Sequence, residues 1–269
     1  MLQIDFNENL ILKEFDFYKK TPGQLKYSNK NYIIKYFQQD VFYKKENELY
    51  NNELIKEKLI NNRCKYLNKN FNELTDNDLL LGFKYSGIYY GYSHFNPLIL
   101  KYFINEFNIN SCYDPCGGWG HRILGALNLD LYIYNDINKN VMNNCKKMCN
   151  YLNISNVSFN NNDCRYFMPN EQYDAIFTCP PYFNIEHYNN DFTSLNEYIE
   201  FIDILFNIFI DSDALIFGIV IREDLLPKIY KKYSYAKFLI KKSGYKYLNK
   251  KISNINNEYM YIFLKNELW

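Results

Sequence analysis

A turn with three glycines directly follows an apolar strand pattern and directly precedes a helix pattern. The strand pattern covers Ser111–Asp114, the glycines are Gly117, Gly118 and Gly120, and the helix pattern covers Gly120–Leu127. Glycine allows a sharp turn and a close approach to a ligand, and the N-terminus of the following helix attracts negative charge. This arrangement predicts an α/β sheet whose first turn binds a nucleotide-like molecule.

From about residue 97 the chain alternates between helix and strand patterns. Helix patterns cover Leu98–Phe107, Asn138–Leu152, Leu195–Ile210 and Leu225–Tyr233, and strand patterns cover Leu131–Asn135, Val157–Phe159, Tyr173–Thr178, Ala214–Ile221, Tyr245–Ile252 and Glu258–Leu264. Short connections between alternating elements predict a doubly wound, mostly parallel sheet. The last two strands have no helix between them, so they predict an antiparallel hairpin at one edge.

The first 90 residues have a different pattern, with helical signals and no strand–turn–helix unit. Glu46–Leu59 has helical spacing of apolar and charged residues, and a second helix near Leu74–Leu81 opens at the capping residue Thr75. We therefore predict a small helical N-terminal region over residues 1–90 and an α/β domain over residues 91–269.

Cysteine usage and hydropathy exclude several classes of protein. The seven cysteines include no Cys-x-x-Cys pair and there are three histidines, so we expect neither a metal site nor a disulfide framework. The longest apolar run, Ala214–Ile221, is too short to span a bilayer, and the N-terminus lacks a signal pattern. These features predict a soluble, intracellular protein located in the cytoplasm and not bound to membranes.

The formal net charge is only +1, but the basic residues are segregated. Residues 225–257 contain nine lysines and no acid, and residues 17–39 contain five lysines and no acid. Basic segments rich in tyrosine are suited to contact with a phosphate backbone. An ordinary solvated surface explains the same lysines equally well, so both interpretations stay open.

Two acidic residues follow the second and third strands of the predicted sheet. Asp136 ends the second strand, nineteen residues after Gly117, where a carboxylate can accept hydrogen bonds from ribose hydroxyls. Asp163 and Cys164 follow the third strand, in the loop that would border an adenine ring, although a solvated loop aspartate fits there as well. Arg122 is expected to bridge elements of the fold.

The fourth strand is followed by Thr178-Cys-Pro-Pro-Tyr. Two successive prolines fix the backbone and remove two N–H donors, so their carbonyls are available to a ligand. Tyr182 adds a flat ring for stacking. This loop is suited to binding a planar amine, and it would face the glycine turn across one cleft because parallel strands bind ligands at their carboxyl ends.

These two motifs, in this order, resemble the S-adenosylmethionine-dependent amino-methyltransferases of DNA, which methylate adenine N6 or cytosine N4. The chain looks especially like phage and large-virus members, with an Asp-Pro-Cys-x-Gly-Trp-Gly turn, and the resemblance covers roughly residues 90–265. It implies a Rossmann-like class I methyltransferase fold, S-adenosylmethionine as cofactor, double-stranded DNA as partner, and base flipping. A monomer or homodimer is expected, with nucleic-acid contacts from the N-terminal region.

The resemblance also assigns residues to roles. The implied catalytic residues are Cys179, Pro180, Pro181 and Tyr182. The implied cofactor-binding residues are Ser93, Phe95, Asp114, Pro115, Cys116, Gly117, Gly118, Gly120, Asp136, Asp163, Cys164 and Thr178. The sequence departs from the family at Cys179, where Asp, Asn or Ser is usual. Cysteine is a weaker acceptor, and its similarity to serine mildly favours cytosine as target.

Other functions stay open at this point. An RNA adenine N6 methyltransferase would use the same residues. A protein glutamine methyltransferase also has Pro-Pro-Tyr after the fourth strand, but normally with a preceding Asn, which is missing here. Cys179 also suggests a catalytically silent partner subunit that binds nucleic acid. A nucleophilic role for Cys179, as in cytosine C5 methylation, is disfavoured because that chemistry uses a Pro-Cys order.

Overall fold

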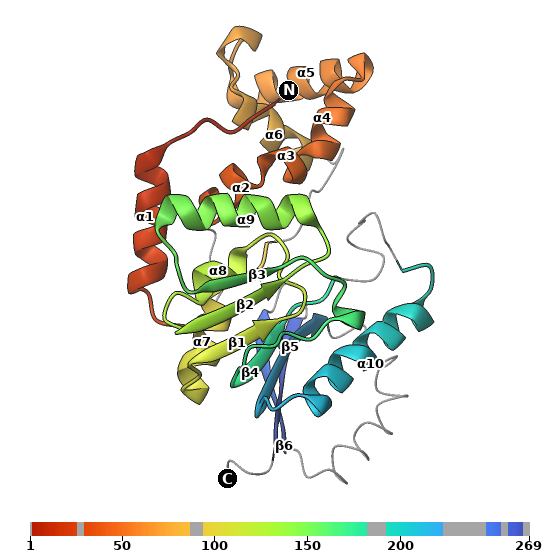
Figure 1. Ribbon diagram of the computed structural model, residues 1–269. Coiled ribbons are helices and arrows are strands. Elements are labelled where there is room, and N and C mark those ends of the chain that lie inside the picture. The colour runs from red at the N-terminus through yellow and green to blue at the C-terminus, as the bar shows by residue number, and fades with distance from the viewer. Residues whose placement is uncertain are drawn as a thin grey trace. The chain divides into compact units, whose positions relative to one another are not determined.

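The computed structural model describes residues 2–25, 30–86, 94–181, 192–222, 246–253 and 258–265. The chain forms two compact units (Figure 1). Unit 1 comprises residues 1–15 and 30–94, and unit 2 comprises residues 16–29 and 95–269. Of the helices in the described ranges, none has the length and apolar character required to cross a membrane.

The secondary structure in the described residues of unit 1 is helical, with turns and extended segments between the helices. Its elements are α2 (Tyr32–Phe37), α3 (Gln39–Phe42), α4 (Lys44–Tyr50), α5 (Glu53–Leu67), the 3-10 turn η1 (Phe71–Glu73) and α6 (Asp76–Tyr85), and α1 (Glu8–Lys20) runs from unit 1 into unit 2. The helical spacing predicted over Glu46–Leu59 corresponds to two helices, α4 and α5, and not to one continuous helix. Two helices occur there because the Asn52 side chain accepts hydrogen bonds from the backbone N–H groups of Leu54 and Ile55 and so begins α5. The predicted cap at Thr75 is confirmed, since its Oγ1 accepts from the N–H of Asp78 at 3.1 Å.

Unit 2 contains a seven-stranded sheet with the order β3-β2-β1-β4-β5-β7-β6. Its elements are α7 (Pro97–Phe107), β1 (Ser111–Asp114), α8 (His121–Gly125), β2 (Leu131–Asn135), α9 (Lys139–Leu152), β3 (Val157–Asn160), η2 (Cys164–Tyr166), β4 (Ala175–Thr178), α10 (Leu195–Asp211), β5 (Ile216–Arg222), β6 (Lys246–Ser253) and β7 (Glu258–Leu264). β1 to β5 pair in parallel, and β7 is antiparallel to both β5 and β6. This confirms the predicted Rossmann-like class I methyltransferase fold with its antiparallel edge hairpin.

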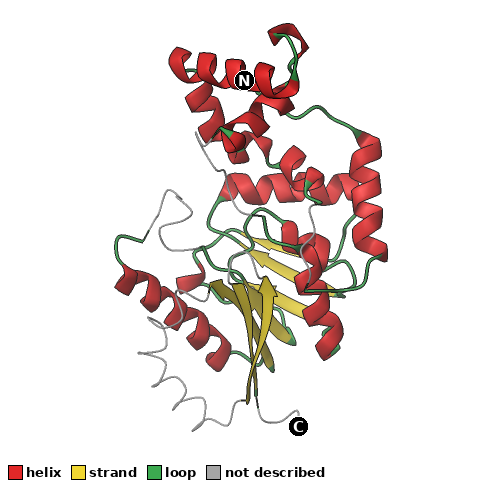
Figure 2. Ribbon diagram, turned by 180° about the vertical axis from the view of Figure 1, so that it is seen from behind, coloured by secondary structure: helices red, strands yellow, loops and turns green. Residues whose placement is uncertain are grey.

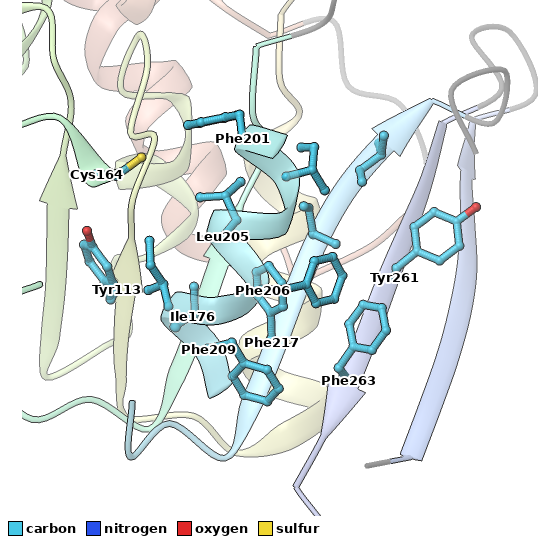
Figure 3. Packing of buried hydrophobic residues seen from close by; sticks show 14 of the residues in the cluster. Tyr113, Cys164, Ile176, Phe201, Leu205, Phe206, Phe209, Phe217, Tyr261 and Phe263 are labelled. Atoms are coloured by element: carbon cyan, nitrogen blue, oxygen red, sulfur yellow. The ribbon is translucent and has the colours of Figure 1, made fainter. Parts of the chain in front are cut away.

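Helices cover both faces of this sheet (Figure 2). On one face, α10 buries aromatic and aliphatic side chains against strands β1, β2, β4, β5 and β7, among them Phe206 against Phe217 and Phe263 (Figure 3). On the other face, Phe103 of α7 packs on Phe177 of β4, with ring centroids 5.0 Å apart. A side chain at Gly218 would not fit there, since its Cβ would lie 2.7 Å from Cδ2 of Phe177.

The predicted element bounds agree closely with the structure in the sheet and less well in α8. β1, β2 and β7 begin and end at the predicted residues. α8 ends at Gly125, not at Leu127, because the N–H of Ala126 bonds to two carbonyls, of Arg122 and Ile123, which tightens the last turn. Gly125 also lies so close to α7 that its Cβ would be 2.3 Å from the Pro97 carbonyl oxygen. The predicted helix Leu225–Tyr233 lies outside the described residues.

Candidate active site

The candidate site lies at the carboxyl ends of β1, β2 and β4. β1 pairs with β2 on one side and with β4 on the other, with Cys112 opposite Ala175 and Tyr113 opposite Ile176. The chain leaves β1 toward one edge of the sheet and later returns to β4 toward the other edge. In sheets of this kind, ligands bind where the strand order reverses. The glycine turn after β1 and the Pro-Pro loop after β4 therefore start next to each other.

Asp114, the last residue of β1, is the polar centre of this region. Its carboxylate is fully buried and accepts hydrogen bonds from Arg122 Nε at 2.5 Å, Tyr132 Oη at 2.5 Å and Thr178 Oγ1 at 3.1 Å. It also accepts from the backbone N–H of Cys116 at 3.2 Å. These donors come from α8, β2, β4 and the glycine turn. Asp114 therefore fixes the relative positions of the elements that surround the site.

Arg122 forms a buried ion pair with Asp114, which confirms the expectation that it bridges elements. Its Nη2 also donates to the carbonyl of Cys116, and its guanidinium carbon lies 5.1 Å from the ring centroid of Phe95. Burial alone would lower the pKa of Arg122, but the Asp114 carboxylate beside it raises that pKa well above its ordinary value. Arg122 therefore stays charged and holds the glycine turn against α8.

The glycine turn has little room at its first glycine and an unusual backbone at the next two. A Cβ on Gly117 would lie 2.2 Å from Cε2 of Tyr134, so the Tyr134 ring requires glycine there. Gly118 and Gly120 have φ angles of 58° and 90°, in the left-handed region that favours glycine. The carbonyl of Gly118 accepts from Tyr134 Oη at 2.6 Å. Tyr134 of β2 therefore holds the glycine turn in place through its ring and its hydroxyl.

Asp136 follows β2 and faces the glycine turn. Its Oδ2 accepts from the N–H of Gly118 and its Oδ1 from the N–H of Asn138, both at 2.8 Å. Each oxygen keeps a further lone pair for a ligand. Burial raises the pKa of Asp136 above its ordinary value, and the two backbone donors offset part of that rise. The next residue, Ile137, is 52% exposed and places an apolar side chain beside this carboxylate.

Sequence reasoning missed Ile137, and it also missed Asn135 at the end of β2. The buried Asn135 side chain donates to the carbonyls of Pro115 at 3.1 Å and Asn162 at 3.0 Å. It therefore links the glycine turn to the loop after β3. The sequence signal for Asn135 is that it is a single polar residue at the end of the apolar run Tyr132-Ile-Tyr, where a buried amide needs hydrogen-bond partners.

In the loop after β3, the Asp163 carboxylate is paired with Arg165, with Oδ2 and Nη2 2.6 Å apart. Asp163 also caps η2 by accepting from the N–H of Arg165. The hydrogen bonds from Arg165 lower the pKa of Asp163. Cys164 is buried, and its Sγ lies 4.0 Å from Sγ of Cys116 in the glycine turn. The structure therefore brings Cys116 and Cys164 together. The carboxylate of Asp163 instead forms an ion pair with Arg165.

The loop after β4 begins with the buried Thr178 and continues through Cys179, Pro180 and Pro181. Cys179 and Cys116 both pack against the hydrophobic cluster under α10. Cys179 is also near enough to Arg122 to affect its pKa, so the two predicted loops share one region. Tyr182 and Ser93 lie outside the described residues. Phe95 lies against Phe177 of β4, with ring centroids 6.1 Å apart.

No protein-family model matches the chain, and no curated protein matches it. Among solved structures, a Streptococcus mutans protein in complex with SAH is 13% identical with a TM-score of 0.43, over 58% of this chain and 88% of that one. An rRNA methylase from Streptococcus thermophilus is 9% identical with a TM-score of 0.44, over 65% and 99%. The N-terminal domain of human METTL16 is 12% identical with a TM-score of 0.45, over 62% and 67%. The strand order β3-β2-β1-β4-β5-β7-β6 is sufficient to identify the Rossmann-like fold.

The described residues offer no obvious metal centre. No group of three or more His, Cys, Asp or Glu side chains in that part of the chain is arranged to hold a metal ion. The groups available for chemistry at the site are the Asp136 carboxylate, the backbone of the glycine turn and the loop after β4.

Proposed function

We propose that the chain is an S-adenosylmethionine-dependent methyltransferase that acts on an exocyclic amino group of a DNA base, adenine N6 or cytosine N4. The observation that carries the proposal is the adjacency of two loops. The Asp-Pro-Cys-Gly-Gly-Trp-Gly turn after β1 and the Thr-Cys-Pro-Pro loop after β4 leave neighbouring parallel strands at the point where strand order reverses. A donor and an acceptor of a methyl group need to meet at such a place.

The residues after β1 and β2 fit the cofactor. Asp136 has free lone pairs for the ribose hydroxyls, and the exposed Ile137 beside it offers an apolar contact for the adenine ring. Gly118 would have only two atoms near an added Cβ, at 3.8 and 3.9 Å, so the backbone is open to a ligand there. When bound, S-adenosylmethionine supplies a methyl group on a positively charged sulfur. Asp114 and Arg122 act in the proposal by positioning the turn.

The residues after β4 fit the amine of a base. Pro180 and Pro181 have no N–H groups, so no backbone donor at these positions competes for the Pro180 carbonyl. In the proposal, this carbonyl accepts a hydrogen bond from the amine and orients its lone pair, and Tyr182 stacks on the base. The thiol of Cys179 is a weaker acceptor than the Asp, Asn or Ser of the enzymes that the chain resembles. Catalysis then depends on positioning, and the base must leave the duplex to reach these residues.

The test is a methyl-transfer assay with product identification. The purified chain is incubated with methyl-labelled S-adenosylmethionine and with double-stranded DNA, single-stranded DNA or RNA, followed by digestion to nucleosides. We expect label in N6-methyladenine or N4-methylcytosine from DNA. Tyr182→Ala should lower turnover and leave SAH affinity unchanged, whereas Tyr151→Ala on the outer surface of α9 should change neither.

Other results would change the proposal in defined ways. Label found only in RNA would assign the chain to RNA adenine methylation, where the same amine is the target. SAH binding without transfer to any nucleic acid would favour the catalytically silent partner subunit. No measurable affinity for S-adenosylmethionine or SAH would contradict the cofactor assignment, and with it the proposal as a whole.

A further inference from the structure

Two tyrosine rings on the surface of unit 1 lie nearly parallel to each other. Tyr66, in the last turn of α5, and Tyr85, the last residue of α6, have ring centroids 6.3 Å apart and ring planes 16° apart. Tyr66 is 74% exposed and Tyr85 is 68% exposed. Side chains with that exposure add little to the hydrophobic core. The packing of α5 on α6 therefore does not account for this pair, which we call the tyrosine surface.

Arg63 fixes both rings from α5. Its guanidinium carbon lies 5.3 Å from the ring centroid of Tyr66 and 5.7 Å from that of Tyr85, which are cation–π distances. The Arg63 side chain crosses α6 at Gly82, where an added Cβ would be 2.7 Å from both Cγ and Cδ of Arg63. The lack of a side chain at Gly82 thus allows one arginine to reach two rings.

The tyrosine surface lies in a segment with excess positive charge. Arg63 is only 4% exposed, and its Nε has no hydrogen-bond partner among the residues that the structure describes. Residues 58–72 contain four basic residues and no acid: Lys58, Arg63, Lys65 and Lys69. Of these, Lys69 is paired with Asp78 at 3.1 Å. A matching ligand offers a flat aromatic face together with negative charge, and a nucleotide has both.

We propose that the tyrosine surface binds an unpaired base of the nucleic-acid substrate by stacking, and that the exposed Lys58 and Lys65 attract its phosphate backbone. This inference rests on the proposed function and adds a second contact with the substrate, located in unit 1. Bases within an intact duplex present no free face, so the tyrosine surface selects single-stranded or locally opened nucleic acid. Arg63 acts by holding the rings, since it is buried.

The experiment measures binding directly, with the full chain and a fluorescently labelled oligonucleotide, by anisotropy. Single-stranded DNA is compared with the same sequence as a duplex. Tyr66→Ala and Tyr85→Ala should each weaken single-strand binding by about tenfold, within the range known for loss of one base–aromatic stack. Tyr66→Phe and Tyr85→Phe keep the ring and should bind like the wild type. Leu54→Ala removes another highly exposed side chain from α5, and should have no effect.

The outcomes separate this inference from the proposed function. If the wild type methylates and binds DNA and both alanine variants bind equally well, the tyrosine surface is not a binding site and the proposed function stands. If the wild type neither binds nor methylates any nucleic acid, both are overturned. Phenylalanine variants that lose as much affinity as the alanine variants would show that the hydroxyls matter, which overturns stacking.

Discussion

The Thr178 hydroxyl donates a hydrogen bond of 3.1 Å to the buried Asp114 carboxylate, and so joins the last residue of β4 to the last residue of β1. The same carboxylate accepts from Arg122 and Tyr132. The glycine turn after β1 and the loop after β4 therefore begin at one shared polar centre. A change at this centre should disturb both loops together.

Asp114→Ala is expected to destabilise the protein strongly. It leaves the Arg122 guanidinium buried without its counter-charge, which typically costs about 3–5 kcal/mol of unfolding free energy. Asp163→Ala is the matched control, because it breaks the partly exposed pair with Arg165 and should cost about 1 kcal/mol or less. Urea unfolding of both variants compares them. Equal losses would contradict the central role of Asp114.

The two adjacent glycines of the turn should respond differently to alanine. Gly117→Ala forces a Cβ against the Tyr134 ring, for an expected loss of about 1–3 kcal/mol. Gly118→Ala has space, but its φ of 58° strains any side chain by about 1 kcal/mol. Thermal unfolding and SAH affinity measure both effects. Tyr134→Val combined with Gly117→Ala should recover part of the loss, and no coupling between the two changes would count against the proposed clash.

Asp136→Asn should weaken SAH binding roughly tenfold or more, because hydrogen bonds to a charged group are lost. The exposed Asp130→Asn is the control and should bind normally. Burial raises the pKa of Asp136, so its carboxylate takes up a proton at a higher pH than an ordinary aspartate. Wild-type affinity should therefore fall as pH is lowered. Titration calorimetry across pH checks this, and a wild-type profile as flat as that of the asparagine variant would refute the ribose assignment.

Glu46→Gln should stabilise unit 1 at neutral and higher pH. Burial raises the pKa of Glu46 to about 7, from 4.5, and its Oε2 has no hydrogen-bond partner among the described residues. Between these two pH values the folded state holds a proton that the unfolded state has released, so unfolding free energy falls as pH rises. The total fall, complete above the folded pKa, is about 3 kcal/mol.

Hydrogen exchange of the amides of α4 measures this effect at about pH 5 and about pH 8. The wild type should be protected better at the lower pH, and Glu46→Gln should lose most of that difference. Glu48→Gln alters an exposed side chain of the same helix and serves as control. An unchanged pH dependence in Glu46→Gln would mean that another group titrates.

Cys179→Ser should keep or raise the rate of methyl transfer, because a hydroxyl accepts hydrogen bonds better than a thiol. Cys179→Ala should be no more than modestly slower, since the Pro180 carbonyl remains. Turnover of both variants at saturating cofactor tests this expectation. Complete loss of turnover in Cys179→Ser with normal SAH binding would instead support a nucleophilic cysteine.

The strand–turn–helix pattern was sufficient to predict β1 and β2 to the residue, because glycines and apolar runs mark such boundaries locally. The split of α4 from α5 was harder to see, since it depends on which asparagine in Asn51-Asn52 acts as a cap. The short α8 ends where the N–H of Ala126 bonds to the carbonyls of both Arg122 and Ile123. Both differences depend on local hydrogen bonds that the pattern of apolar residues does not specify.

For the candidate site, sequence reasoning found the residue types and missed their partners. Tyr132 reads as an ordinary strand residue, and its hydroxyl reaches Asp114 only because of the register between β1 and β2. From the sequence, Asp163 is expected to contact the cofactor. In the structure its carboxylate accepts hydrogen bonds from the side chain of Arg165, two residues away. Rotamers and strand register determine these contacts, and neither is encoded in a short motif.

The strand order divides the sheet into two halves that could change independently in sequence, on either side of the reversal between β1 and β4. In the proposed function, β1 to β3 and the turns that follow them form the half of the sheet that would hold the methyl donor. The other half, which begins with β4 and the described part of the loop after it, would receive the acceptor. If the proposed function is correct, mutations in the acceptor half could change the substrate without altering the half that would hold the donor. A chimera that joins the halves of two such chains would have to preserve the hydrogen bond between Asp114 and Thr178, because it connects the two halves.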